Sequence, residues 1–176
     1  DDNAKKTDAN GFAKLTYALN PKIDLYGDMQ LRNVAYSFLG FNNELDNVTQ
    51  QVNYTFFNPK AGLLWRLLDG TQAYGSFAVA NREPNRDDLD ETTPASRPGP
   101  ERLYDTELGI EHRAGRWNAG VNAYYMDYTD QLVLTGELND VGAALRTNVP
   151  QSYRAGVELM FGVQIAKPLT WKANAT

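Results

Sequence analysis

Apolar and polar side chains alternate with a period of two along most of this chain. In the stretch 153–165 the odd positions hold Tyr, Ala, Val, Leu, Phe, Val and Ile, whereas the even positions hold Arg, Gly, Glu, Met, Gly and Gln. Successive side chains of a β-strand point to opposite faces of the sheet, so this period predicts strands with one apolar face. The same alternation, in places weaker, runs through seven other segments: 12–19, 23–32, 60–67, 72–80, 104–113, 117–126 and 169–176.

The connections between these segments alternate in length. Short ones lie at 20–21, 68–71, 114–116 and 166–169, and long polar ones rich in Asn, Asp, Pro and Gly at 37–53, 81–101 and 130–152. This order is typical of an up-and-down antiparallel sheet with one plain end and one end that carries function. No segment has a convincing helical period. The sequence therefore predicts an all-β fold.

The apolar face of the predicted strands carries no charge. The charged side chains of the strands fall on the other parity and include Lys14, Asp24, Asp28, Arg32, Arg66, Asp105, Glu107, Glu111, Arg154, Glu158 and Lys172. A charge at the bilayer midplane costs roughly 2–4 kcal/mol, so a lipid-facing surface must be free of charge. This pattern predicts a transmembrane β-barrel segment with charged side chains facing the lumen. A soluble sheet with a buried core face remains the alternative.

Aromatic residues mark the two ends of the predicted strands. Trp65, Trp117 and Trp171 all lie beside short connections, which indicates an aromatic belt at one membrane interface. A second belt is expected near the long connections, from Tyr104, Tyr125, Tyr128 and Tyr153. The alternation in 117–125 ends at Asp127, where we expect the chain to leave the bilayer.

Composition excludes several classes of protein. The net charge is −5 without a Lys/Arg block, which argues against a nucleic-acid partner. The absence of cysteine and the single His112 leave no metal-ligand spacing, so neither a metal nor another cofactor is expected. No apolar run approaches the roughly 18–20 residues of a membrane-spanning helix. No Ser/His/Asp order or phosphate-binding loop is present, so an enzyme is not expected.

Several stretches resemble the barrel of TonB-dependent outer-membrane receptors. They are "FFNPKAGLLWRL", "SFAVANREPNRDD", "PERLYDTELGIEHR" and "AGVNAYYMDYTDQLVLTGELNDVGAALRTNVPQSYRAGVEL". The resemblance covers most of 54–176 and, more loosely, 12–53. It implies a barrel of about 22 strands with a plug domain, in the bacterial outer membrane. Residues 1–176 would then be a fragment of that barrel domain, about eight strands long, without the plug domain and the C-terminal strands. The partners it implies are outer-membrane lipid, TonB through the absent plug and TonB box, and a small-molecule or metal-chelate ligand.

The segment "NREPNRDDLDE" and the Pro-rich stretch after it contain the candidate ligand contacts. Arginine suits carboxylates and anionic ferric chelates, so a surface loop of this kind could touch a ligand. The alternative is a solvated loop whose charges pair with one another. The candidate residues are Arg82, Glu83, Arg86, Asp87, Asp88 and Arg97.

Three functions are compatible with these features. The resemblance implies a receptor that takes up a scarce nutrient with energy supplied through TonB, most often a ferric siderophore or another iron complex. A self-contained eight-stranded outer-membrane barrel with a structural or adhesive role is the first alternative, because eight strands can close on themselves. A soluble all-β binding module is the second.

Overall fold

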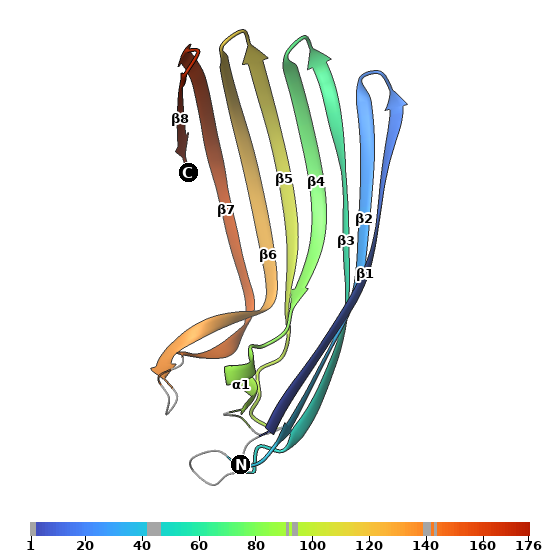
Figure 1. The fold of residues 1–176 in the computed structure, drawn as a ribbon, viewed down its shortest axis with the longest axis vertical. Helices are drawn as coiled ribbons and strands as arrows, with labels where there is room; N and C mark the ends of the chain where they lie inside the picture. Colours follow the sequence, from blue (N-terminus) through green and yellow to red (C-terminus); the bar gives the residue numbers. More distant parts are fainter. Residues whose placement is uncertain (1–2, 42–46, 91, 93–94, 139–141, 143) are drawn as a thin grey trace.

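The computed structural model consists of one antiparallel sheet whose eight strands follow in chain order, and it describes residues 3–41, 47–90, 92, 95–138, 142 and 144–176 (Figure 1). This confirms the predicted all-β, up-and-down architecture. The described edge strands do not pair with each other, so the eight strands form an open wall and not a closed barrel. The elements are β1 (Asn3–Asn20), β2 (Ile23–Leu39), β3 (Gln50–Leu68), β4 (Thr71–Arg82), α1 (Arg86–Asp90), β5 (Glu101–Ala114), β6 (Trp117–Leu138), β7 (Ala144–Ala166) and β8 (Leu169–Ala175).

The four short connections are two-residue turns at one end of the sheet, and the long connections and α1 lie at the other end (Figure 1). We call these the turn end and the loop end. The predicted long connections at 37–53 and 81–101 correspond to the segments between β2 and β3 and between β4 and β5, although the first is shorter than predicted.

The prediction of a long connection at 130–152 is wrong, and so is the prediction that the strand beginning at Trp117 ends at Asp127. β6 continues to Leu138 and pairs with β7, which begins at Ala144. The backbone of this hairpin is irregular in two places. Asp130 has a φ of 53°, and the register shifts between Leu134 and Leu138. In Figure 1 this hairpin end turns aside from the rest of the sheet. β1 also begins earlier than predicted, at Asn3, and pairs with β2 along its whole length.

The two faces of the sheet differ as the alternation predicts. We call the face with the charge-free parity the outer face and the opposite face the inner face. On β6 and β7 the outer face carries large exposed apolar side chains such as Val121 and Val157, whereas Asn122, their neighbour on the inner face, is buried. Glu107, Glu111 and Glu158 share the inner face with Asn122, since β5, β6 and β7 pair in register. The tyrosine at 128 also lies on this face and is buried, so it does not belong to an outer aromatic belt.

Three tyrosines of the inner face lie against glycines of the neighbouring strand. Tyr26 pairs with Gly62, Tyr74 with Gly109, and Tyr124 with Gly156. A Cβ atom added at Gly62 or at Gly156 would lie 2.5 Å from the hydroxyl oxygen of its tyrosine, closer than real Cβ contacts allow. Each glycine therefore provides the space in which a tyrosine ring lies along the sheet.

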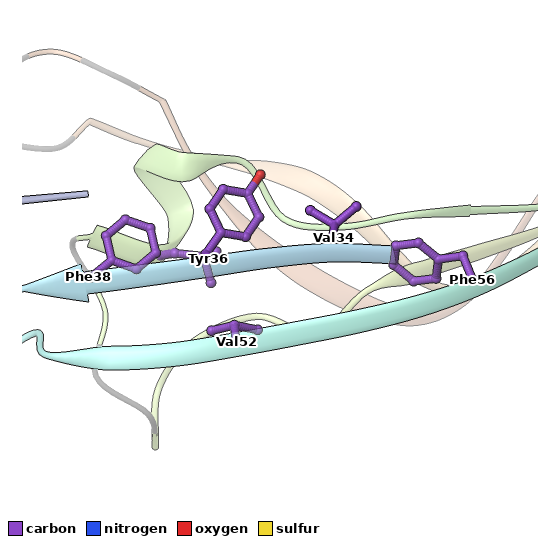
Figure 2. Close-up of a cluster of buried hydrophobic side chains, with 6 residues drawn as sticks. Val34, Tyr36, Phe38, Val52 and Phe56 are labelled. Atoms are coloured by element: carbon purple, nitrogen blue, oxygen red, sulfur yellow. The ribbon is translucent and has the colours of Figure 1, made fainter. Parts of the chain in front are cut away.

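The inner face becomes apolar near the loop end. Val34, Tyr36 and Phe38 of β2 and Val52 and Phe56 of β3 form a buried cluster there (Figure 2). Leu89 of α1 completes it and is fully buried. We call these six residues the loop-end core. It arises because α1 covers the inner face at this point, so the side chains beneath it are shielded from water.

Candidate ligand site at the loop end

The segment between β4 and β5 is fixed to the sheet by Asp88. In the first turn of α1 the Asp88 carboxylate accepts a 2.8 Å hydrogen bond from the backbone N–H of Asn85, which caps the helix. The same carboxylate accepts a 3.1 Å bond from the backbone N–H of Arg146 in β7 and lies 3.7 Å from its guanidinium. Only 1% of Asp88 is exposed. Asp88 therefore joins α1 to the far side of the sheet.

Gln50 fixes the same segment to β3. Its amide nitrogen donates to the backbone carbonyls of Leu89 at 2.5 Å and Thr92 at 2.8 Å. Its amide oxygen accepts a 3.1 Å hydrogen bond from Arg97. Gln50 is buried, so these bonds satisfy its polar atoms away from water. Together with Leu89 in the loop-end core, they hold the segment against β2 and β3.

A network of charges lies beside this segment on the inner face. Glu83, directly after β4, accepts two 2.8 Å hydrogen bonds from the guanidinium of Arg32 and one of 3.2 Å from Lys6. Arg32 also binds Asp8, at 2.6 Å. Burial opposes ionisation of Glu83, but the hydrogen bonds from Arg32 and Lys6 outweigh it and lower the pKa of the carboxyl. The Arg32 guanidinium lowers the pKa of Asp8 in the same way.

The network borders a recess of about 560 Å³ between β1, β2 and the start of α1. Four cationic residues of the inner face and the β4–β5 segment line it, against two carboxylates, and Lys5 borders it from the outer parity of β1, opposite Ser37. Glu83 is already engaged by two of the cations, whereas Asp87 is exposed. Within the lining, cations outnumber carboxylates, although Arg32 and Arg82 also bind the carboxylates of Asp8 and Glu101 at its edge. The ionic lining residues are Lys5, Lys6, Arg32, Arg82, Glu83, Arg86 and Asp87.

Four of the six candidates from the sequence line this recess: Arg82, Glu83, Arg86 and Asp87. Arg82 extends from the end of β4, forms a 2.9 Å ion pair with Glu101 and donates to the carbonyl of Leu132. Its side chain is still 52% exposed. The other two candidates, Asp88 and Arg97, bind protein groups outside the recess, as described above. The described residues contain no group of three or more His, Cys, Asp or Glu that could hold a metal ion.

Sequence reasoning did not assign Lys6, Asp8 and Arg32 to this site. Arg32 was placed on the inner parity, but nothing local linked it to a loop 51 positions later. One signal was present: Arg32 is an inner-face charge near the strand end that adjoins a long connection. Such a charge is a candidate partner for the oppositely charged residues of that loop.

The wall is open and antiparallel, with a tryptophan beside three of its four two-residue turns and long connections at the other end. Its outer face carries charges towards the loop end, at Lys5, Arg102 and Asp127, and an apolar surface below them. These are the features of the wall of an outer-membrane β-barrel. The chain belongs to the TonB-dependent receptor-like β-barrel family, whose model matches residues 1–176. It is therefore a barrel segment of the bacterial outer membrane.

Solved structures of the family have the same fold. The "Copper transporter OprC" matches with a TM-score of 0.80 and 17% identity, covering 97% of this chain and 27% of that one. The FrpB iron transporter of Neisseria meningitidis (F3-3 variant) matches with a TM-score of 0.69 and 19% identity, covering 97% and 25%. The ferric yersiniabactin uptake receptor FyuA of Yersinia pestis matches with a TM-score of 0.77 and 15% identity, covering 98% and 26%.

This chain thus spans about a quarter of the length of those structures. Among curated protein sequences, none matches it. No helix in the described part of the chain is long and apolar enough to cross a membrane.

Proposed function

We propose that residues 1–176 are part of the barrel of a receptor that takes up a scarce nutrient, most often a ferric siderophore or another iron complex. In this proposal the plug domain, the TonB box and the remaining strands belong to other parts of the receptor, and TonB supplies energy through them. Three features support a transport role over catalysis: the family, the inner-face recess at the loop end, and the names of similar structures, which include copper and iron transporters.

The observation that carries the proposal is the excess of cations in the recess. Arg82 and Arg86 are exposed there, whereas Lys5 borders the recess from the outer parity of β1. Guanidinium groups bind carboxylate, hydroxamate and catecholate oxygens well, because their N–H donors are planar and permanently charged. The recess opens on the inner face at the loop end, the side from which a ligand would enter the barrel. An anionic metal chelate is the ligand that this charge distribution favours.

The sharpest test compares two neighbouring charges of α1 in the intact receptor. Arg86→Gln removes a cation from the recess, and Asp87→Asn, the matched control, removes an anion one residue away. We expect binding of an anionic ferric chelate to weaken by about tenfold, roughly 1.4 kcal/mol, in Arg86→Gln and to be unchanged or tighter in Asp87→Asn. The probes are ferric citrate, a ferric hydroxamate and a ferric catecholate, each supplied as the sole iron source. Equal losses in both variants would contradict an anion-binding recess, and growth on none of the probes would contradict iron uptake.

A further inference from the structure

Two cations lie in neighbouring turns at the turn end. Arg116 is in the turn between β5 and β6, and Lys167 is in the turn between β7 and β8. Both side chains are exposed, and neither forms a hydrogen bond or ion pair with any residue that the structure describes. Because β6 pairs with β7, the two turns are neighbours (Figure 1). Because no described residue binds these charges, they are available to a partner.

Gln164 of β7 links the two turns. Its backbone N–H donates a 2.7 Å hydrogen bond to the carbonyl of Arg116, and its side-chain amide donates a 3.4 Å bond to the carbonyl of Lys167. The backbones that carry the two cations are therefore held on either side of one residue. A ligand that binds both side chains does not have to order the turns first, which lowers the cost of binding.

An aromatic surface adjoins the two cations on the outer face. Trp117 and Trp171 both pair with Val163, one from each side, and thus lie at the same depth. The ring of Phe161 lies between them, with centroids 6.4 Å from Trp117 and 5.9 Å from Trp171. All three aromatic side chains are at least 40% exposed. Tryptophans on a lipid-facing surface prefer the depth of the lipid headgroups.

We propose that Arg116 and Lys167, together with Trp117 and Trp171, form a binding site for the headgroup of an anionic phospholipid. Short turns of outer-membrane barrels lie on the periplasmic side, so the lipid belongs to the inner leaflet. The two cations bind the phosphodiester oxygens, and the indole rings pack against the glycerol and the first part of the acyl chains. A zwitterionic lipid offers the same phosphate, but its own cation opposes the pair of positive side chains.

The site makes a quantitative prediction about lipid preference. A cation near an anionic membrane surface is worth roughly a fivefold gain in binding, so two cations give a preference of roughly 25-fold. The preference should weaken as salt is raised, because the charges are exposed to solvent. This inference requires only the outer-membrane location and does not depend on the nutrient that the receptor takes up.

Native mass spectrometry of the intact receptor tests the site directly. The receptor is titrated with phosphatidylglycerol and, separately, with phosphatidylcholine of the same acyl chains. We expect the unaltered receptor to prefer phosphatidylglycerol by roughly 25-fold at the tightest site, and the double variant Arg116→Gln/Lys167→Gln to prefer it by less than threefold. Equal binding of both lipids by the unaltered receptor, or an unchanged preference in the double variant, would overturn the proposal.

A matched control separates this site from the effect of net charge. Lys14→Gln/Lys60→Gln removes the same two charges from the inner face of β1 and β3, and neither lysine forms a hydrogen bond or ion pair with a described residue. This variant should keep the full preference, and an equal loss in it would also overturn a local site. Trp117→Leu should weaken both lipids by a similar factor, because the ring contacts parts that the two lipids share. A loss confined to phosphatidylglycerol in that variant would contradict the role given to the indole.

Discussion

Arg32 and Glu83 lie 51 positions apart in the chain and form a two-bond ion pair, with both oxygen–nitrogen distances at 2.8 Å. The pair joins an inner-face strand position of β2 to the first residue after β4. Glu83 is only 7% exposed, so its partners replace water. The ion pair therefore fixes where the segment that contains α1 leaves the sheet.

Removing the charge of Glu83 should loosen this segment. In Glu83→Gln the guanidinium of Arg32 keeps Asp8 but loses its buried partner, which should cost about 1–3 kcal/mol of local stability. Hydrogen exchange of the amides in 83–90 should accelerate, whereas that of the strands at the turn end should not. Asp87→Asn is the control, because Asp87 is exposed. Unchanged exchange in Glu83→Gln would show that the pair does not hold the segment.

The same network predicts a dependence on pH. The pKa values of Glu83 and Asp8 are lowered in the folded protein. Both groups lie at the loop end, because Glu83 follows β4 and Asp8 pairs with Val34 of the loop-end core. When the pKa of a carboxyl is lower in the folded than in the unfolded protein, its ionised form stabilises the fold. This stabilisation is complete above the ordinary pKa, which is 4.5 for Glu83, and is lost as the pH falls through the pKa of the folded protein. After correction for the intrinsic exchange rate, the protection of the amides in 83–90 should therefore not change with pH near neutrality. It should fall in acid, as the two carboxylates become protonated. Glu83→Gln should lack most of the acid-dependent loss.

Leu89 should be the residue of α1 that matters most for stability. Leu89→Ala removes a fully buried side chain from the loop-end core, and such changes cost about 2–5 kcal/mol. We expect protease cleavage within 83–100 of the intact receptor, while its heat-resistant barrel still assembles. Asp87→Ala provides an exposed control in the same helix. If both variants resist protease equally, α1 is not held by the loop-end core.

Glycines beneath the inner-face tyrosines should resist substitution. Gly62→Ala and Gly156→Ala place a methyl group where Tyr26 and Tyr124 lie, and should lower the thermal unfolding temperature of the receptor in detergent. A Cβ at Gly27 of β2 meets no atom within 4 Å, so Gly27→Ala is the matched control. In Gly156→Ala/Tyr124→Ala the steric part of the loss should disappear, because the three nearest atoms all belong to Tyr124, and a double-mutant cycle measures this. Additive losses would mean that the ring does not occupy that space.

Spin labels can establish which face meets lipid. We expect labels at Val121 and Val157 on the outer face of the intact receptor to be accessible to oxygen, which dissolves in lipid. Labels at Asn122 and Glu158 on the inner face should be accessible to a water-soluble relaxation agent. The reverse accessibilities would show that the inner face meets lipid and the outer face meets water, which would contradict the assignment.

The strand pattern in the membrane region could be predicted from sequence because one physical constraint repeats along it. Lipid excludes charge from every second residue, so 117–125 and 153–165 reveal both their period and their face. Past Asp127 the constraint ends, and the polar sequence of β6 resembles a loop although its backbone continues to pair with β7. Pairing of backbone groups needs a neighbouring strand, which local composition does not reveal.

The candidate site was predictable only in part for a related reason. Charges of the β4–β5 segment could be recognised locally, and four of them line the recess. The contacts of the site could not be predicted from the sequence, because they join residues far apart in the chain. Arg32 binds Glu83, 51 positions away, and Asp88 binds Arg146, 58 positions away. A buried Asp88 and an exposed Asp87 look alike in a sequence, since α1 is too short to show a periodic apolar face.

Because of the loop-end core, substitutions on the inner face of β2 should have different effects at its two ends. On β2 the inner parity faces the barrel lumen at Asp28 and a dry interior at Val34, within the same uninterrupted strand. A polar residue introduced at Asp28 would be neutral, whereas one at Val34 would act as in the core of a water-soluble protein. The loop end can therefore be redesigned by the rules of a globular core, while the residues on the outer face are left unchanged. Substitutions at the loop end can therefore accumulate in such receptors without affecting insertion into the membrane.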